Sequence, residues 1–197
     1  NGCLNSFSFP QVYLTEPDPI TVTFASPKYT GNVDVSCRGY SDGHVWISSI
    51  TGGNPGGFTY KWYTFDGTIT GPDTLDRLDF VTAGTYYLLT TDIYCTKLDS
   101  VTLIQGSGMD LTSYSEHFTS DSLYNISCYG GNDGSIDLTI TGGSGNYTYF
   151  WTDSASYTAN TQDITGLRAG TYVCQVTDQN GCILKLLPGA VLPSFTL

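Results

Sequence analysis

Apolar and polar residues alternate in short runs along this chain, and turn-forming residues separate the runs. The first half contains the runs I-T-V-T-F at 20–24, F-T-Y-K-W-Y at 58–63 and Y-Y-L-L-T-T at 86–91. A period of two residues is typical of strands with one buried face, and G-G-N-P-G-G at 52–57 is a strong turn pattern. No stretch has a convincing helical period. The pattern therefore predicts an all-β protein of many short strands.

Twelve strands are expected, six in each half of the chain. Those of the first half lie at 20–24, around Val45, Ile47 and Ile50, at 58–63, around Leu75, Leu78 and Phe80, at 86–91 and at 100–104. Those of the second half lie at 111–118, 135–140, 147–151, 161–164, 172–177 and 183–187. Their order and spacing are similar in the two halves, as expected for a sequence repeat.

Matching residues across the two halves establish a tandem repeat. Residues 128–182 read C-Y-G-G-N-D-G-S-I, then T-G-G, Y-F-W, A-G-T-Y and T-D-Q-N-G-C; residues 37–95 carry a looser version. The matched positions are Cys37 with Cys128, Asp42-Gly43 with Asp133-Gly134, Trp62 with Trp151, and 83–86 with 169–172. The two halves are therefore expected to share one fold.

The repeat divides the chain into three parts. Residues 18–105 and 106–197 each form one repeat of ordinary domain size, with the linker near 106–108. Residues 1–17 alternate before Pro17 and are expected to be the final strand of a preceding repeat. Asn1-Gly2-Cys3 matches Asn180-Gly181-Cys182, so we interpret the sequence as a piece of a longer array.

The pattern C-x-G-x-x-D-G, T-G-G, Y-x-W, A-G-T-Y and T-D-x-N-G-C resembles the SprB repeat of Bacteroidota surface proteins. The second half matches almost throughout. The first half departs from it at T-T-D-I-Y-C, residues 90–95, where the Asn-Gly turn is missing. The resemblance implies a very large cell-surface adhesin of gliding bacteria, exported by the type IX system.

Two further features favour tandem immunoglobulin-like β-sandwiches. Trp62 and Trp151 lie on the third strand, where that fold buries its tryptophan, and A-G-T-Y resembles the tyrosine corner. Cys174 aligns with Leu88, and its expected partner strand contains no cysteine. We therefore expect Cys174 to be a buried free thiol.

The composition restricts the classes of partner. The net charge is −11, from 7 Lys and Arg against 18 Asp and Glu, which disfavours binding to nucleic acid. No apolar run reaches membrane-spanning length, so membrane insertion is not expected.

The six cysteines contain no C-x-x-C spacing, which favours disulfides in an oxidising compartment over zinc. Four of them, Cys37, Cys95, Cys128 and Cys182, are disulfide candidates, and two pairings are open. One joins Cys37 to Cys95 and Cys128 to Cys182 within each repeat, although these positions lie at opposite ends of an immunoglobulin sandwich. The other joins Cys37 to Cys182 between repeats and leaves Cys3, Cys95 and Cys128 for neighbouring repeats.

Catalytic motifs are not found, so the chain is not expected to be an enzyme. His44 and His117 belong to no H-E-x-x-H pattern, and no serine stands in G-x-S-x-G. The G-G-S-G run at 142–145 fits a hairpin turn, and Asp76 and Asp79 flank a short strand without an implied cleft.

Calcium is the one cofactor considered. Asp42, Asp133 and Asp178 stand in tight loops that could offer oxygen ligands. The alternative is that Asp, Asn and Gly simply form these turns.

The resemblance also implies O-glycosylation at Asp-Ser or Asp-Thr followed by an apolar residue. Four positions match this motif: Thr74, Ser100, Ser122 and Ser154. We expect at least one of them to be modified.

Together with the tandem repeat, the resemblance implies a stalk segment of an extracellular adhesin, attached to the outer membrane and used in gliding motility. Its expected partners are neighbouring repeats, polysaccharide or solid surfaces and, through other regions, the gliding or secretion machinery. Exposed tyrosines on the sheet faces are the expected contact groups. The alternative function is a spacer or carbohydrate-binding module of a secreted polysaccharide-degrading enzyme.

Overall fold

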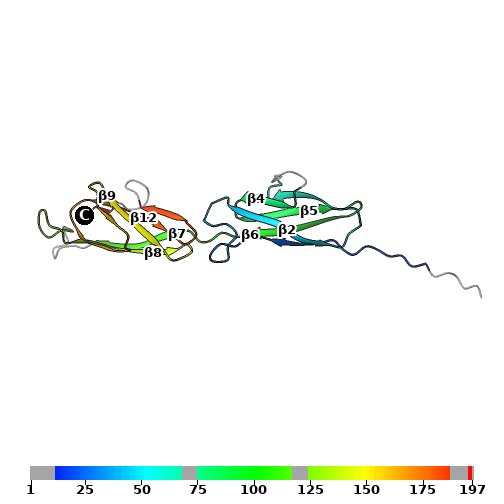
Figure 1. The fold of residues 1–197 in the computed structure, drawn as a ribbon, viewed down its shortest axis with the longest axis horizontal. Coiled ribbons are helices and arrows are strands. Elements are labelled where there is room, and N and C mark those ends of the chain that lie inside the picture. Colours follow the sequence, from blue (N-terminus) through cyan, green and yellow to red (C-terminus); the bar gives the residue numbers. More distant parts are fainter. Residues whose placement is uncertain (1–11, 68–74, 117–123, 187–194, 197) are drawn as a thin grey trace, which may run out of the picture.

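The computed structural model describes residues 12–67, 75–116, 124–186 and 195–196. Within these ranges the chain forms strands, turns and loops, with no helix. The strands make two sandwiches arranged end to end, with β1 to β6 in the first and β7 to β14 in the second (Figure 1). The prediction of an all-β protein is confirmed.

The first sandwich pairs two antiparallel three-stranded sheets. One contains β1 (Thr21–Ala25), β2 (Gly43–Thr51) and β4 (Arg77–Val81), in the order β1-β2-β4. The other contains β3 (Thr59–Thr64), β5 (Gly84–Thr91) and β6 (Thr96–Leu103), in the order β3-β5-β6.

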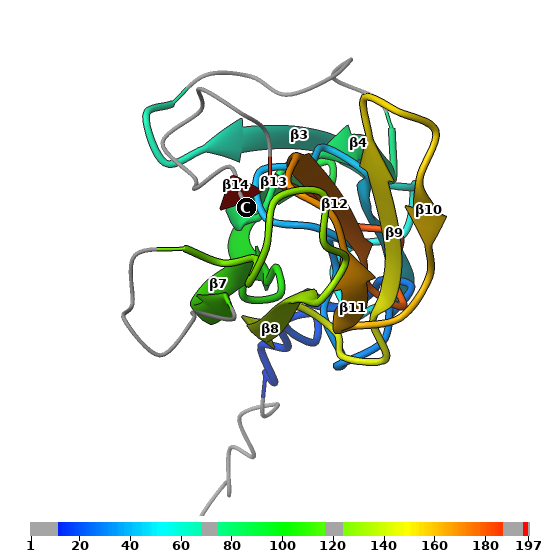
Figure 2. The same cartoon turned by 90° about the vertical axis from the view of Figure 1, so that its left-hand side faces the viewer.

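The second sandwich repeats this arrangement, and Figure 2 shows it from its outer end. Its first sheet contains β7 (Met109–Glu116), β8 (Gly134–Gly142) and β11 (Ile164–Leu167), in the order β11-β8-β7. Its second sheet contains β9 (Thr148–Asp153), β10 (Thr158–Ala159), β12 (Thr171–Thr177), β13 (Ile183–Leu186) and β14 (Phe195–Thr196). Both sandwiches have an immunoglobulin-like strand order. In the first, strands β1, β2 and β4 lie opposite β3, β5 and β6, and in the second, β7, β8 and β11 lie opposite β9, β10, β12 and β13.

Each core is built around the predicted tryptophan. Trp62 is 1% exposed and donates its indole N–H to the carbonyl of Leu75 at 3.1 Å. Trp151 is fully buried and donates to the carbonyl of Thr161 at 2.9 Å. In each sandwich the indole polar group is thus satisfied while the ring fills the space between the sheets.

Both predicted tyrosine corners are present. The Tyr86 hydroxyl donates to the carbonyl of Thr82 at 2.8 Å, and the Tyr172 hydroxyl donates to that of Arg168 at 3.0 Å. Cys174 is a fully buried free thiol, as predicted, and burial raises its pKa to about 12. It fills the position that Leu88 fills in the first sandwich.

A β-bulge explains the spacing of Ile47 and Ile50. Strand β2 pairs Ser49 with Thr23 but Ile47 with Phe24, so Ser48 is the extra residue. Because side chains alternate along a regular strand, residues three apart face the same side only across such a bulge.

Some expected strands differ from those observed. The strand expected at 161–164 is observed at Ile164–Leu167, as β11. Thr161 lies in a turn before this strand, and its hydroxyl donates to the carbonyl of Asp163. The short strands β10 and β14 were not predicted. Residues 12–20 form no strand, and the rest of the segment 1–17 lies outside the described residues.

The described part of the chain contains no helix with the length and apolar character needed to cross a membrane.

Candidate functional site: the junction between the sandwiches

A disulfide joins the two sandwiches. Cys37 lies on the loop before β2, and Cys182 lies on the turn between β12 and β13. Their Cα atoms are 5.5 Å apart, and Cys37 is only 4% exposed. This bond closes a covalent loop between residues 145 positions apart in the sequence.

The alternative pairing, Cys37 with Cys95 and Cys128 with Cys182, is absent. Cys95 and Cys128 are free and exposed. The reason is the length of the sandwich, because Cys37 lies at one end of β2 and Cys95 lies at the other end of the domain. The nine residues of β2 span roughly 30 Å, far beyond the reach of a disulfide.

Asn180 connects the same two loops through hydrogen bonds. Its side-chain oxygen accepts the N–H of Thr30 at 3.1 Å. Its side-chain nitrogen donates to the carbonyls of Thr30 at 3.1 Å and Ser36 at 3.3 Å. One amide side chain thus satisfies three backbone groups of the opposite sandwich.

The linker is bound to the first sandwich by a backbone network. The carbonyl of Ile104 accepts the N–H groups of Asp34 at 2.7 Å and Val35 at 3.1 Å. The Asp34 carboxylate in turn accepts the N–H of Ile104 at 3.0 Å, and the side-chain oxygen of Gln105 accepts the N–H of Gly39 at 2.8 Å. These bonds hold the chain that leads into the second sandwich.

The end of the linker is bound to the second sandwich. The N–H of Gly143 donates to the carbonyls of Ser107 at 3.1 Å and Gly108 at 3.2 Å. Gly142 has φ +82°, and a Cβ there would lie 2.2 Å from the carbonyl oxygen of Gly108. Only glycine permits this approach of two backbones.

The Asp34 carboxylate is the charged centre of the junction. It is 2% exposed and contacts the Lys28 ammonium and the Ser26 hydroxyl. Burial alone would raise its pKa, but the hydrogen bonds from Ile104, Lys28 and Ser26 outweigh this effect, so the pKa is lowered. The Asp34 carboxylate therefore remains ionised and keeps its hydrogen bonds to Ile104, Lys28 and Ser26.

A polar cavity of about 250 Å³ lies where the two sandwiches meet. Its lining comes from both sides of the junction: Thr30, Gly31, Val33, Ser36, Gln105, Gly106, Ser107, Gly143, Ser144, Asp178 and Asn180.

The turn that carries Cys182 is closed by Asp178, one of the three calcium candidates. Its carboxylate accepts the N–H groups of Ser144 at 2.9 Å, Asn180 at 3.0 Å and Cys182 at 2.9 Å. We call residues 178–182, together with the matching residues 92–95, the clasp turns.

Asp92 closes the clasp turn of the first sandwich in the same way. It accepts the N–H groups of Asn54 at 2.7 Å, Tyr94 at 2.8 Å and Cys95 at 2.7 Å. The bonds from Asn54 and then Tyr94 lower its pKa to about 2. Asp92 was not among the predicted site residues, although the T-D that precedes each of the two cysteines is a pattern that could have identified it.

The other calcium candidates also accept hydrogen bonds within their own loops. Asp42 accepts the N–H of Ser36 at 3.1 Å and also contacts its hydroxyl, and Asp133 accepts the N–H of Ser127 at 3.2 Å. Among the described residues, no three His, Cys, Asp or Glu side chains lie close enough to hold a metal ion. The three aspartates are not brought together, and the geometry favours turn formation as their role.

The residues considered for catalysis have structural contacts. His44 lies 2.8 Å from the Asp79 carboxylate, which also pairs with Arg77 at 2.7 Å. Asp76 accepts the N–H of Ile47 through its backbone carbonyl. His117 lies outside the described residues.

Two of the four glycosylation candidates can be located. Ser100 is exposed on β6, and Ser154 is exposed in the turn after β9. Thr74 and Ser122 lie outside the described residues.

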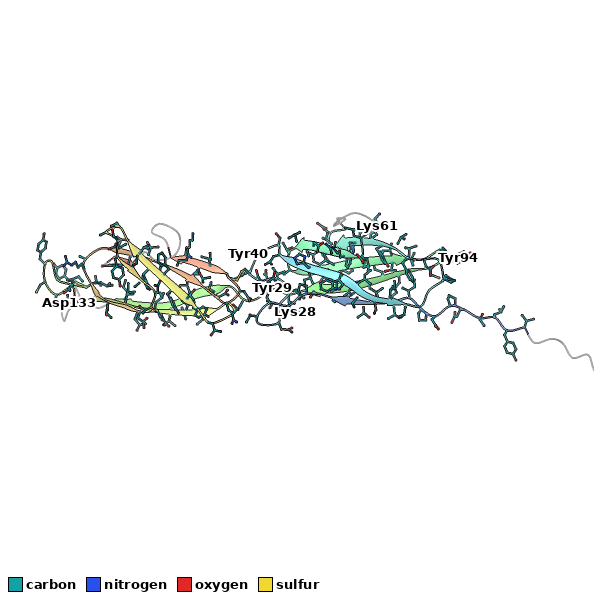
Figure 3. All side chains as sticks on the ribbon, in the orientation of Figure 1. Lys28, Tyr29, Tyr40, Lys61, Tyr94 and Asp133 are labelled. Atoms are coloured by element: carbon teal, nitrogen blue, oxygen red, sulfur yellow. A yellow bond between two sulfur atoms is a disulfide. The ribbon has the colours of Figure 1, made fainter. Side chains whose placement is uncertain are left out.

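The most exposed tyrosines lie outside the sheet faces where they were expected, and one of them, Tyr13, is 80% exposed in the segment before β1. Tyr94 is 82% exposed at one end of the described molecule, while Tyr124 and Tyr129 are 65% and 109% exposed in the loop that carries Cys128. Figure 3 shows Tyr94 at one end, Asp133 of the same Cys128 loop at the other, and Tyr29 and Tyr40 at the junction. The sheet β3-β5-β6 still carries a shallow hollow of about 460 Å³ lined by Tyr63, Thr64, Phe65, Gly67, Tyr87, Leu89 and Leu98.

Comparisons with known proteins give one match to a family model and several structural alignments. Residues 120–156 match the family model described as SprB repeat. No match was found among curated proteins.

Several solved structures have a similar arrangement of strands. An I-band fragment of titin aligns with TM-score 0.40 and 11% identity, over 88% of this chain and 64% of that chain. The insect immune protein hemolin aligns with TM-score 0.37 and 15% identity, over 89% and 47%. A C-terminal fragment of intimin, solved with the intimin-binding domain of its translocated receptor, aligns with TM-score 0.35 and 15% identity, over 85% and 62%. This chain thus covers less than two thirds of each of these structures.

Proposed function

We propose that the chain, whose residues 120–156 match the SprB repeat model, is a stiff stalk segment of a bacterial cell-surface adhesin of that family. In this proposal residues 18–105 and 106–197 are two repeats, and residues 1–17 belong to a preceding one. The parent protein is exported by the type IX system, is attached to the outer membrane and serves gliding motility.

The observation that carries the stalk function is the junction. A disulfide and the three hydrogen bonds of Asn180 join the loop that carries Cys37 to the turn that carries Cys182. The linker is bound to the loop of Cys37 and, at its other end, to Gly143 on the turn after β8. Because the contacts reach two separate turns of the second sandwich, bending of one sandwich against the other must break several hydrogen bonds together. Stability of such an array is nearest-neighbour in character.

The chemistry of the chain suits an extracellular position. Disulfides persist in oxidising environments outside the cytoplasm. The net charge of −11 favours solubility and disfavours association with other acidic surfaces.

The stalk proposal is tested by small-angle X-ray scattering on the oxidised chain and on the double variant Cys37→Ser/Cys182→Ser. The oxidised chain should give one elongated particle whose largest dimension is constant across salt concentrations. The variant should give a broader distance distribution, because the remaining contacts are non-covalent. A control variant, Asp137→Ala, changes an exposed position on β8 outside the junction and should leave the profile unchanged. Equal flexibility in all three proteins would contradict the proposal.

A second candidate function, polysaccharide or surface binding, is supported by the hollow on sheet β3-β5-β6. Aromatic side chains such as Tyr63, Phe65 and Tyr87 provide large, rigid contact areas for sugar rings or solid surfaces. Such a hollow suits an adhesin, and equally a carbohydrate-binding module of a polysaccharide-degrading enzyme.

Binding of the chain to polysaccharides and to hydrophilic and hydrophobic surfaces tests this second function. Saturable binding that is weakened by Phe65→Ser, with Tyr129→Ser as the control at a distant exposed site, would support it. Loss of binding in chelator would identify a requirement for calcium. Absence of binding to all of these would restrict the function to that of a spacer.

A further inference from the structure

The two outer ends of the molecule carry loops that match the two sides of its junction. At the junction, the loop 33–42 of the first sandwich faces the clasp turn 178–182 of the second. The matching loop, 124–133, lies at the outer end of the second sandwich, and the matching clasp turn, 92–95, lies at the outer end of the first. Figure 3 shows these ends through Asp133 and Tyr94.

Each outer end has the same hydrogen-bonded turn as its counterpart at the junction. In the two loops, the N–H of Tyr40 donates to the carbonyl of Cys37 at 3.1 Å, and that of Gly131 donates to the carbonyl of Cys128 at 2.8 Å. An aspartate six residues after a serine accepts the serine N–H in both loops, at 3.1 Å and 3.2 Å.

The two clasp turns match in the same manner. The N–H of Asp92 donates to the carbonyl of Cys95 at 3.0 Å, and the N–H of Asp178 donates to the carbonyl of Cys182 at 3.0 Å. Cys95 therefore lies in a turn equivalent to the turn of Cys182, and Cys128 lies in a loop equivalent to the loop of Cys37. Unlike Cys37 and Cys182, Cys95 and Cys128 are exposed thiols.

The surfaces beside the two free thiols are complementary in chemistry. A hollow of about 700 Å³ beside Cys128 is lined by Tyr124, Ile126, Tyr129 and Arg168 among others. A hollow of about 450 Å³ beside Cys95 is lined by Glu16, Asp18, Ile20 and Lys97 among others. The carboxylates of Glu16 and Asp18 beside Cys95 can pair with the guanidinium of Arg168 beside Cys128.

An exposed aromatic residue stands next to each of the two cysteines, Tyr94 beside Cys95 and Tyr129 beside Cys128. Ile93 and Tyr94 are 57% and 82% exposed. The clasp turn at the junction instead carries the polar Asn180, and it is one residue longer than residues 92–95. The two outer ends thus match each other in exposed aromatic character.

We propose that these ends bind one another head to tail, so that the loop of Cys128 in one repeat pair receives the clasp turn of Cys95 in a second copy. The contact is completed by a Cys95–Cys128 disulfide. Both thiols lose their protons, the new S–S bond forms, and two electrons pass to a small-molecule disulfide such as oxidised glutathione, which leaves as two thiols. Because the contact joins two different surfaces, repetition gives an open linear assembly. The inference extends the proposed stalk function and rests on it.

Two complementary variants test this contact in the full-length chain. Both carry Cys3→Ser to remove the cysteine outside the described residues. One adds Cys95→Ser and offers only the Cys128 end, and the other adds Cys128→Ser and offers only the Cys95 end. They are mixed in a buffer of oxidised and reduced glutathione, at close to the roughly millimolar effective concentration that a short tether provides.

The mixture should yield a covalent heterodimer on non-reducing gels, with Cys95 joined to Cys128 in the peptide map. Each variant alone should yield several-fold less dimer. Tyr94→Ser in the Cys95 partner should reduce heterodimer formation several-fold, whereas Phe65→Ser, at an exposed aromatic away from the ends, should not.

Equal amounts of heterodimer and of both homodimers would overturn the proposal, as would glutathionylated monomers without heterodimer. The same peptide map reports the Cys37–Cys182 bond. A missing heterodimer with that bond intact would leave the stalk proposal standing, whereas loss of the Cys37–Cys182 bond would count against both.

Discussion

Asp178 and Asp92 close equivalent turns, and each carboxylate accepts three backbone N–H groups. Replacing Asp178 with Ala would leave the N–H groups of Ser144 and Cys182 without their side-chain acceptor, whereas that of Asn180 still donates to the Ser144 hydroxyl. We expect a loss of about 1–3 kcal/mol in the free energy of unfolding, measured by guanidinium denaturation. Asp137→Ala, at an exposed position on β8, is the matched control and should change stability by less than about 0.5 kcal/mol. Equal effects of the two variants would contradict the role of Asp178.

The pKa of Asp92 predicts how stability depends on pH. Its pKa falls from 3.8 to about 2 on folding, because the N–H groups of Asn54 and Tyr94 stabilise the charged form. A lowered folded-state pKa means that this stabilisation is fully present above about pH 4 and is lost as the pH falls toward about 2. The pKa values of Asp34, Asp42 and Asp79 are also lowered, so they act in the same direction.

Guanidinium midpoints measured at successive pH values check this expectation. The wild-type midpoint should decrease through that acidic window, and Asp92→Asn, which does not titrate, should show a shallower decrease. A midpoint that stays constant or rises as the pH falls would count against it.

Residues whose burial follows from a strand pattern could be predicted from the sequence. Residues that bind distant segments of the chain at the junction could not. Trp62, Trp151 and Cys174 were assigned correctly because each stands in a strand pattern that fixes its burial. Asn180 and Asp34 act on chain segments 150 and 70 residues away, and no local pattern reports such a separation. Asp178 was interpreted as a possible calcium ligand because turns and metal loops use the same residue types.

At the scale of elements, the tyrosine corner connects the strand before the clasp turn to the preceding loop. Tyr172→Phe removes the hydroxyl that donates to the carbonyl of Arg168, while the ring keeps its place in the core. We expect a loss of about 0.5–1.5 kcal/mol in the free energy of unfolding, measured by the same denaturation. Tyr129→Phe, at a fully exposed site, serves as the control and should be neutral. A neutral Tyr172→Phe would mean that the corner does not stabilise the second sandwich.

Strand identity was more predictable than strand boundaries. Strands β5 and β12 were placed within two residues, because their alternation is regular and a Gly-Thr pair marks the start of each. Strand β11 begins at Ile164, the last residue of the predicted strand. Thr161 does not pair with β8, because its carbonyl accepts the indole N–H of Trp151 and its hydroxyl donates to the carbonyl of Asp163. The short β10 has only two residues and gives no periodic pattern.

At the scale of the whole molecule, the sequence left two cysteine pairings open because it does not show which loops meet. The repeat placed one cysteine at each end of each sandwich, and strand length argued against a bond within a sandwich. The choice between pairings depends on how the second sandwich is seated on the first. That seating is set by the linker bonds of Ile104 and Gly143, which are backbone contacts and have no side-chain pattern.

The disulfide also determines how the molecule responds to tension along its length. A force applied through the two ends of the chain passes from Cys37 to Cys182 through the S–S bond, so the residues between them cannot extend. These cysteines are 145 residues apart, which corresponds to roughly 500 Å of extended chain that remains hidden. Single-molecule pulling should therefore release this additional length only after reduction or in Cys37→Ser/Cys182→Ser, whereas Cys95→Ser should behave as the oxidised parent. Full extension of the oxidised chain would show that force does not pass through this bond, and the stalk would then depend on the strength of its individual sandwiches.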